Sequence, residues 1–313
     1  MKILITGANG FVGSELTSLL AKAGHQLRLA TRSGNSIESD SVTLPTFAIG
    51  DIQTFDSWDA YLEGVDVVVH LAARVHQMDD HDSDARQAYL QSNVDATVRL
   101  AEAAIRCGVK RFIFLSSIKV NGEDTANSEP FSTGDIDSPL GDYAQSKWQA
   151  EQQLDRLSAG SNIDVVIIRP PLVYGPGVKA NFMRLVNLAR SGLPIPFLGI
   201  DNRRDMVSVY NLCDLIALCI DHDNAAGKKF LVSDGVAYST ADIILAVRLI
   251  LGLPKRLFYL PPGSLRWPLK LLGKSDLYDR LFGSLEVDIT DTIETLDWSP
   301  KYTLEHTLRV MLY

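Results

Sequence analysis

Residues 2–13, with the sequence KILITGANGFVG, decide the fold that we predict for this chain. The run Lys2–Thr6 is short and apolar, which is typical of a buried parallel strand, and a glycine-rich turn follows it directly. Gly7 permits a tight turn, Gly10 lets the backbone approach a pyrophosphate, and Gly13 lets the next helix lie close to the strand. The start of that helix offers free N–H groups to an anion. This stretch predicts a nucleotide-binding turn, whereas an isolated glycine triplet would also fit a loop without a ligand.

The composition is that of an ordinary globular protein. Of 313 residues, 46% are hydrophobic and 22% are charged, which excludes extensive disorder, a collagen-like chain and a disulfide framework. The formal net charge of -8 disfavours a general nucleic-acid binder. Cys107, Cys213 and Cys219 are widely spaced, so we expect reduced thiols in a cytoplasmic protein. We expect no membrane span and, with a strand beginning at residue 2, no signal peptide.

Strand and helix patterns alternate through the first half of the chain. Helices are expected at 11–23, after Asp56, at 85–107 and at 143–157, and strands at 26–31, 42–49, 65–71, 111–116 and 164–169. This alternation predicts an α/β fold with a doubly wound parallel sheet, in which ligands bind at the carboxyl ends of the strands. Beyond Pro170 the pattern loosens, and a strand near Phe230 is expected to return to the sheet.

We therefore predict two parts. A Rossmann-like NAD(P)-binding domain would comprise residues 1–170, with 205–233 returning to it, and a smaller substrate lobe would comprise 171–204 and 234–313.

The end of the second expected strand indicates which cofactor binds. An acidic residue there would bind the ribose hydroxyls of NAD, whereas a basic residue would accept the 2′-phosphate of NADP. This chain has Thr31 and Arg32. A guanidinium binds phosphate well and no carboxylate is present to repel one, so we expect NADP(H), with NAD as the alternative. Asp51 and Ile52, after the third strand, are expected to flank the adenine.

Tyr143 and Lys147 lie four residues apart at the start of an expected helix, so the phenol and the ammonium share one face. We expect Lys147 to stabilise the phenolate and lower the pKa of Tyr143 from its usual value of about 10. Tyr143 would then exchange a proton with a substrate hydroxyl or carbonyl while a nicotinamide exchanges a hydride with the same carbon. Ser117 follows the strand at 111–116 and would hold the reacting oxygen.

Taken together, these residues resemble the extended short-chain dehydrogenase/reductases, the NAD(P)-dependent epimerases and dehydratases of nucleotide sugars. The similarity extends over nearly the whole chain. It rests on TGANGFVG at 6–13, Gly50–Ile52, HLAA at 70–73, Asn93–Val94, Leu115–Ser117, the Tyr143 and Lys147 pair, RPPLVYGPG at 169–177 and Arg203–Asp205.

The resemblance implies roles for individual residues. Ser117, Tyr143 and Lys147 would form the catalytic set, with Lys147 also bonding the nicotinamide ribose. Cofactor contacts are implied at Gly7, Gly10, Phe11, Val12, Gly13, Thr31, Arg32, Asp51, Ile52, Leu71, Ala72, Ala73, Asn93, Tyr143, Lys147 and Pro170. Substrate contacts are implied at Arg74, Ser117, Lys119, Val173, Asn181 and Arg204, where an ion pair of Arg204 with Asp205 is the alternative. Pairing through helices 85–107 and 143–157 would give a homodimer.

Departures from the family pattern reduce the number of reactions that we expect for this chain. Dehydratases of the family have an acidic pair after the serine or threonine, whereas this chain has Ile118 and Lys119, so we do not expect dehydration. Epimerases of the family usually have an acidic residue at the position of Thr31 and hold NAD permanently, whereas an NADP-type pocket suits a net reduction. The usual Arg-x-Gly-Asp motif is also missing, and Arg280 and Asp288 are candidates to replace it.

The stretches 117–122, 176–182 and 283–288 are similar to a bacterial surface-polysaccharide branch of the family, whose members are often labelled UDP-glucose 4-epimerase. Some of that branch resemble reductases of UDP-4-keto-6-deoxy-N-acetylglucosamine. The leading hypothesis is therefore an NADPH-dependent 4-keto reductase of such a UDP-sugar. The alternatives are a 4-epimerase of UDP-glucose or UDP-N-acetylglucosamine and, outside enzymes, an NADP-sensing binding protein.

Two further segments receive plain interpretations. Residues 78–84 have metal-ligand side chains without a fixed spacing, so we expect a solvated acidic loop and no metal. Residues 265–274 are basic and amphipathic and are expected to pack within the small lobe, with contact to a membrane or partner as the alternative.

Overall fold

The computed structural model describes residues 1–39, 42–75, 85–135, 139–261, 264 and 281–313. Among these residues, seven parallel strands form one sheet in the order β12-β8-β7-β6-β1-β2-β5. Their bounds are β1 Lys2–Thr6, β2 Gln26–Thr31, β5 Thr46–Ala48, β6 Val67–His70, β7 Arg111–Leu115, β8 Asp164–Arg169 and β12 Lys229–Leu231. The expected α/β fold with a doubly wound parallel sheet is confirmed, and the strand expected near Phe230 forms at the edge beside β8.

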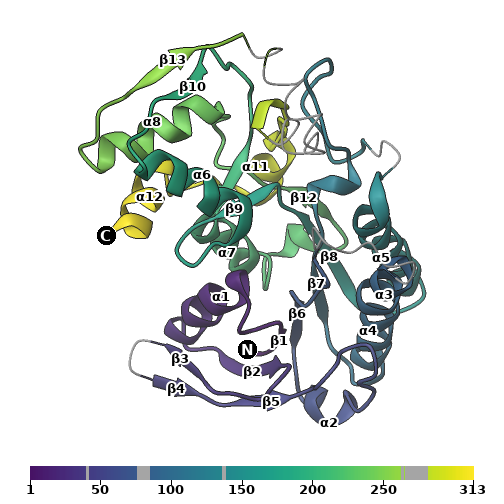
Figure 1. Cartoon of the computed structure of the whole chain (residues 1–313). Coiled ribbons are helices and arrows are strands. Elements are labelled where there is room, and N and C mark those ends of the chain that lie inside the picture. The colour runs from purple at the N-terminus through teal and green to yellow at the C-terminus, as the bar shows by residue number, and fades with distance from the viewer. Residues whose placement is uncertain (40–41, 76–84, 136–138, 262–263, 265–280) are drawn as a thin grey trace.

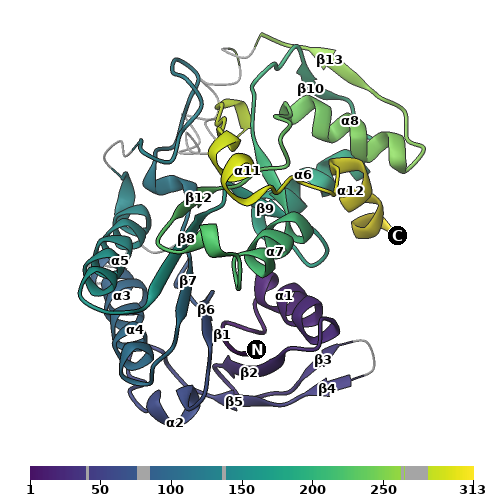
Figure 2. The same cartoon turned by 180° about the vertical axis from the view of Figure 1, so that it is seen from behind.

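Helices cover both faces of the sheet (Figures 1 and 2). On one face lie α1 (Phe11–Lys22) and α7 (Val209–Leu218), and on the other lie α2 (Asp59–Leu62), α3 (Ala85–Tyr89), α4 (Ala96–Arg106) and α5 (Gly141–Ala159). The strands alternate between the two cores. Ile3 and Ile5 pack with α1 and α7, whereas Leu4 packs with α4 and α5. Both faces are apolar because both are covered, which explains the continuous apolar runs in the sequence.

Two expected elements are interrupted. The helix predicted for 85–107 contains a π-helical turn, η1 (Leu90–Asp95), between α3 and α4. The strand predicted for 42–49 is divided at Pro45 into β4 (Val42–Leu44), which pairs antiparallel with β3 (Ile37–Ser39), and β5 in the main sheet. Proline has no N–H for a strand ladder, so Pro45 ends one pairing and the next begins after it.

The second half of the chain builds a smaller part beyond the carboxyl edge of the sheet (Figure 1). Its strands pair in parallel, β9 (Leu172–Tyr174) with β11 (Met206–Ser208) and β10 (Ile195–Leu198) with β13 (Leu257–Tyr259). Its helices are α6 (Ala180–Arg190), α8 (Thr240–Ile250) and α12 (Leu304–Leu312), whereas α11 (Thr290–Leu296) packs against β12 at the edge of the main sheet. The part of the chain that the structure describes also contains two short 3₁₀ turns, η2 (Ile118–Val120) and η3 (Asp223–Ala225). The division into a domain of 1–170 plus 205–233 and a lobe of 171–204 plus 234–313 stays a prediction.

Candidate active site

The glycine turn between β1 and α1 is tightly packed against the end of β6. Gly7 has φ +69°, and a Cβ there would lie 2.9 Å from the backbone nitrogen of Ala72. A Cβ on Gly13 would lie only 2.1 Å from the carbonyl oxygen of Gly7. No side chain caps the start of α1 at Gly10, so the first N–H groups of the helix remain available to an anion. This cradle fits the diphosphate of a dinucleotide, and Phe11 and Val12, whose cofactor contacts stay predictions, begin α1 directly after it.

The residues at the end of β2 lie where the adenosine ribose of a dinucleotide would be recognised. Thr31 is buried, and its Oγ1 accepts a hydrogen bond from the Gly34 backbone at 3.0 Å, whereas Arg32 is exposed. The adjoining loop is fixed by Arg99, which donates to the carbonyl oxygens of Ile52 at 3.2 Å and Gln53. Asp51 accepts a hydrogen bond from the Gln53 backbone at 3.0 Å. Arg32 is therefore the exposed cation at the position where a ribose phosphate would be recognised.

His70, at the end of β6, is completely buried between two threonines. Its Nδ1 lies 2.6 Å from Thr6 Oγ1 and its Nε2 lies 2.9 Å from Thr97 Oγ1. Thr97 donates its hydroxyl proton to the carbonyl oxygen of Asn93 at 2.8 Å, so its oxygen must accept from Nε2. His70 is thus the neutral tautomer with the proton on Nε2, and burial lowers its pKa from 6.5 to about 3.

This burial predicts a loss of stability in mild acid. Between pH 6.5 and 3 the unfolded chain binds a proton at His70 that the folded chain does not, so the free energy of unfolding falls as the pH falls. At pH 5 the contribution of His70 is about 2 kcal/mol less favourable than at pH 7. Urea unfolding at both pH values checks this, and a His70→Gln variant should show a smaller drop by that amount. Equal drops in the two proteins would contradict it.

Asn93, presented by the π-helical turn, connects the loop after β6 with α5. Its Oδ1 accepts from the Arg74 backbone at 2.8 Å, and its Nδ2 donates to the Arg74 carbonyl oxygen and to Ser146 Oγ, each at 3.0 Å. Ser146 in turn donates to the carbonyl oxygen of Tyr143 at 2.8 Å. Both amide protons are therefore used within the protein, which makes Asn93 a positioning residue in this structure. Its cofactor contact stays a prediction.

The three residues predicted to be catalytic lie together at the carboxyl edge. The Tyr143 phenol lies close enough to the Ser117 side chain to interact with it, and Ser117 begins η2, where its Oγ accepts a hydrogen bond from the Lys119 backbone at 3.3 Å. The Tyr143 ring lies edge-on to Tyr89, with ring centroids 6.2 Å apart. Lys147 Nζ donates to the carbonyl oxygen of Leu115 at 2.7 Å and lies 4.4 Å from the centre of a neighbouring phenyl ring, that of Phe114. A hydroxyl, a phenol and an ammonium therefore lie near one another at this edge of the sheet.

The ionisation of this pair differs from the expectation. Part of the Tyr143 surface is accessible, yet the surrounding protein raises its pKa to about 12, and the hydrogen bond from Ser117 opposes this only in part. Burial lowers the pKa of Lys147 to about 7, against the attraction of Glu151. The expected lowering of the Tyr143 pKa by Lys147 is therefore wrong for this structure, because desolvation outweighs a cation that is itself only partly protonated near neutral pH.

The predicted substrate residues come from both halves of the chain. Arg74 places its guanidinium 5.6 Å from the ring centre of Tyr89, and Lys119 forms an ion pair with Glu123 at 2.7 Å. Val173 lies half-buried on β9 and Asn181 lies exposed in the first turn of α6. Arg204 is mostly buried, and this burial lowers its pKa against the attraction of Asp124. These residues surround the carboxyl edge, and their contacts with a substrate stay predictions.

The structure also shows the surroundings of other residues that were expected to contact the cofactor or the substrate. Pro170 is buried, and its carbonyl oxygen accepts from the Ile118 backbone at 3.0 Å, which fixes the start of η2. Leu71–Ala73 form the half-buried loop against Gly7. Asp288 accepts from the Thr290 backbone at 2.9 Å at the start of α11, which is a structural use of the carboxylate. Arg280 and the segments 78–84 and 265–274 lie outside the described residues.

Three neighbours of the site were given no role from the sequence, although Arg169 opens the stretch at 169–177 on which the resemblance rests. Tyr89 packs against Tyr143, Glu151 lies one turn after Lys147 on α5, and Arg169 ends β8. A signal existed for Glu151, because a carboxylate four residues after a lysine shares its helix face. Tyr89 and Arg169 reach the site through tertiary packing, which leaves no local pattern.

The described residues offer little support for other site types. No group of three or more His, Cys, Asp or Glu in this part of the chain is arranged to hold a metal ion. All three cysteines are free, and Cys213 and Cys219 are buried. None of the helices among the described residues is long and apolar enough to cross a membrane.

Comparison with known proteins gives a consistent result. Residues 3–233 match the model of the NAD dependent epimerase/dehydratase family. A UDP-glucose 4-epimerase of Vibrio cholerae is 47% identical over 305 residues, which cover 97% of this chain and 92% of that protein.

Solved structures share the fold. The UDP-glucose 4-epimerase of Thermotoga maritima with UDP-glucose has a TM-score of 0.79 at 21% identity and covers 99% of this chain and 97% of its own. The UDP-glucuronic acid 4-epimerase of Bacillus cereus in complex with NAD has a TM-score of 0.77 at 24% identity, covering 99% and 95%. The chain belongs to the NAD dependent epimerase/dehydratase family.

Proposed function

We propose that this enzyme interconverts the C4 epimers of a UDP-sugar with a bound NAD cofactor, and that UDP-glucose is the best-supported substrate. The observation that supports this most directly is the 47% identity to the UDP-glucose 4-epimerase of Vibrio cholerae over 97% of the chain. The expected 4-keto reductase thus becomes the second candidate, and the epimerase, first considered as its alternative, becomes the leading one.

The side chains at the carboxyl edge suit this reaction. The nicotinamide ring, when bound, supplies a centre that accepts a hydride from C4 and returns it. As the phenolate, Tyr143 takes the proton from the O4 hydroxyl and, as the resulting phenol, gives it back, while Ser117 beside it holds that oxygen. Lys147 is positioned four residues later, where its ammonium stabilises the phenolate as it forms. Epimerisation further requires that the keto sugar present its other face before the hydride returns.

Tyr143 and Lys147 have complementary proton affinities for this role. A phenolate whose phenol has a pKa of about 12 is a strong base, so it takes the O4 proton readily, and the phenol can still protonate an O4 alkoxide, which is also strongly basic. An ammonium with a pKa of about 7 releases or takes up a proton near neutral pH without a large free-energy cost. The pair therefore matches proton transfer in both directions, as a reversible epimerisation requires.

One specific observation favours the second candidate, an NADPH-dependent reduction of a 4-keto UDP-sugar. Arg32 is exposed at the end of β2, and the neighbouring Thr31 offers no carboxylate to ribose hydroxyls. This arrangement suits the 2′-phosphate of NADP, and a reductase must exchange its spent cofactor.

A single assay separates the two candidates. Purified protein is mixed with UDP-glucose, and separately with UDP-N-acetylglucosamine, without added cofactor, and the products are resolved by chromatography. Formation of the C4 epimer supports the epimerase. The absence of any epimer, together with oxidation of added NADPH when UDP-4-keto-6-deoxy-N-acetylglucosamine is supplied, would establish the reductase instead. The nucleotide released by denaturing the purified protein tells whether NAD is retained. Absence of both activities would leave the NADP-binding protein.

The association of two copies through α4 and α5, which the resemblance implies, also remains a proposal. Light scattering after size-exclusion chromatography tests it, because a dimer doubles the chain mass of 34.4 kDa.

A further inference from the structure

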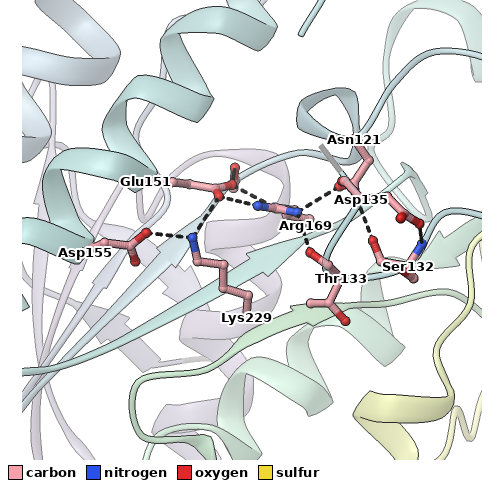
Figure 3. Close-up of polar contacts among 9 residues, drawn as sticks. Asn121, Ser132, Thr133, Asp135, Glu151, Asp155, Arg169 and Lys229 are labelled. Atoms are coloured by element: carbon pink, nitrogen blue, oxygen red, sulfur yellow. Dashed lines mark hydrogen bonds and ion pairs between the residues drawn. The ribbon is translucent and has the colours of Figure 1, made fainter. Parts of the chain in front are cut away.

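Two oppositely charged side chains lie almost completely buried beside the candidate active site. Arg169 at the end of β8 and Glu151 on α5 are 0% and 1% exposed. The guanidinium binds the carboxylate at both oxygens, with Nη2 to Oε2 at 2.6 Å and Nε to Oε1 at 3.0 Å (Figure 3). Such a paired contact fixes direction as well as distance, so the end of β8 is held against one turn of α5.

The other side of the guanidinium holds the loop that precedes α5. Nη1 donates to Asn121 Oδ1 at 3.1 Å and to the carbonyl oxygen of Thr133 at 3.2 Å. Asn121 follows η2 and donates both amide protons, to the carbonyl oxygens of Ser132 at 2.8 Å and Asp135 at 2.6 Å (Figure 3). Arg169 therefore connects β8, the end of η2 and the loop leading to the start of α5.

The carboxylate completes the connection next to the predicted catalytic residues. Ser116 donates its hydroxyl proton to Glu151 Oε1 at 2.5 Å, and Ser116 is the residue directly before Ser117. On α5, Glu151 follows Tyr143 by eight residues and Lys147 by four, so all three share one face of the helix. The cluster of Ser116, Asn121, Glu151 and Arg169, which we call the Arg169 cluster, thus touches both elements that hold Ser117 and Tyr143.

Stability alone does not account for this cluster. Burying both charges costs desolvation free energy, and an apolar pair of similar volume is often as stable as a buried ion pair or more so. What an apolar pair would lack is the directional contact at both oxygens and the link to Asn121.

We propose that the Arg169 cluster is a positioning unit that sets the distance between the Ser117 hydroxyl and the Tyr143 phenol in the reacting complex. This inference rests on the proposed roles of Ser117 and Tyr143 at O4. A displacement of about 1 Å between reacting groups can lower a rate about 100-fold, so the geometry of such a unit has a measurable consequence.

The test uses a variant that removes both charges together. Glu151→Gln with Arg169→Met keeps the volume and removes both charges together, so we expect a folded protein whose thermal unfolding midpoint is lowered only by the loss of the Arg169 donor to Asn121 Oδ1 and to the Thr133 carbonyl oxygen. Its kcat for C4 epimer formation is expected to fall about 30-fold, whereas KM for the UDP-sugar changes less than about twofold. A merely structural pair would leave kcat at the parental value in a variant that folds normally.

A double-mutant cycle with Ser117→Ala shows whether the cluster acts through Ser117. In the parent we expect Ser117→Ala to lower kcat about 100-fold, and in the charge-free background by less than about fivefold, because Ser117 is already misplaced there. Equal losses in the two backgrounds would overturn the proposal. If Ser117→Ala and Tyr143→Phe both keep parental activity, the proposed roles of these residues fail first and the positioning inference fails with them.

Two further variants make the test secure. Asp155→Asn is the matched control, because this half-exposed carboxylate lies one turn further along α5 and pairs with Lys229 at 2.7 Å, whereas Lys229 reaches Glu151 of the cluster only at 3.7 Å. Its kcat should equal that of the parent. If the charge-free variant does not fold, Ser116→Ala removes one hydrogen bond to Glu151 and no charge, and a fall in kcat of about fivefold is expected. The proposal would be overturned if Ser116→Ala kept full activity and if Ser117→Ala lowered kcat as much in the Ser116→Ala background as it does in the parent.

Discussion

Tyr143→Phe is expected to lower kcat for C4 interconversion about 1,000-fold while the protein remains folded. The substitution removes only the phenolic oxygen, which is the group that we propose to transfer the O4 proton and which interacts with the Ser117 side chain. The aromatic ring keeps its edge-on contact with Tyr89 at a centroid distance of 6.2 Å, so the packing of α5 should persist. Steady-state kinetics with UDP-glucose and circular dichroism of the same preparation check both halves of this expectation.

The matched control is Tyr61→Phe, which makes the same chemical change on α2, where the ring stacks on Phe47 at 3.9 Å. It should retain parental kinetics. A Tyr143→Phe protein that is folded and retains more than about a tenth of the parental kcat would show that another group moves the O4 proton.

Lys147→Met is expected to lower kcat about 300-fold without lowering stability. The ammonium is buried, and its pKa falls from 10.5 to about 7, because protonation of Lys147 costs more free energy in the folded chain than in water. Methionine fills a similar volume without a charge to desolvate, and it cannot stabilise a phenolate at Tyr143. Activity and stability should therefore change in different directions at this position.

The pH dependence gives the sharper measurement. Between pH 7 and 10 the unfolded chain holds a proton on Lys147 that the folded chain has lost, so the free energy of unfolding of the parent should rise with pH in this range. Lys147→Met lacks this contribution, and its stability should rise less. Lys110→Met, at a lysine whose side chain is 77% exposed, is the control and should follow the parent. Parallel curves for the parent and Lys147→Met would contradict the buried, depressed lysine.

Lys147 differs from the buried polar groups around it in how far its charge is compensated. His70, Lys147, Glu151 and Arg169 are all buried beside one sheet edge, where each polar group needs a partner to offset its desolvation. The hydrogen bonds of His70 and of the Arg169 cluster provide such partners. Lys147 differs, because its partners are one carbonyl oxygen and a ring face, which leaves its charge incompletely compensated. Incomplete compensation is the property that a group needs when it must respond to a forming phenolate.

Local patterns were sufficient for the framework of the sheet. The strands Gln26–Thr31 and Asp164–Arg169 lie where the apolar runs predict them, and α1 begins at Phe11 directly after the glycine turn. Strand and helix periodicity, turn chemistry and the order of elements all act over a few residues, so they are visible in the chain. For the same reason Ser117, Tyr143 and Lys147 could be placed at one edge, since parallel strands end on the same side.

Packing was needed for the properties of those residues. The pKa of Tyr143 rises because protein surrounds it, and neither its neighbour Tyr89 nor the position of Lys147 under Leu115 follows from spacing. The pairing of Arg169 with Glu151 joins a strand to a helix, and its burial depends on every element that covers it. Desolvation is a sum over the three-dimensional surroundings of a group, whereas a motif records only its neighbours along the chain. The positions of Tyr143 and Lys147 along the chain can therefore be predicted from local sequence patterns, whereas their pKa values depend on the folded protein that surrounds them.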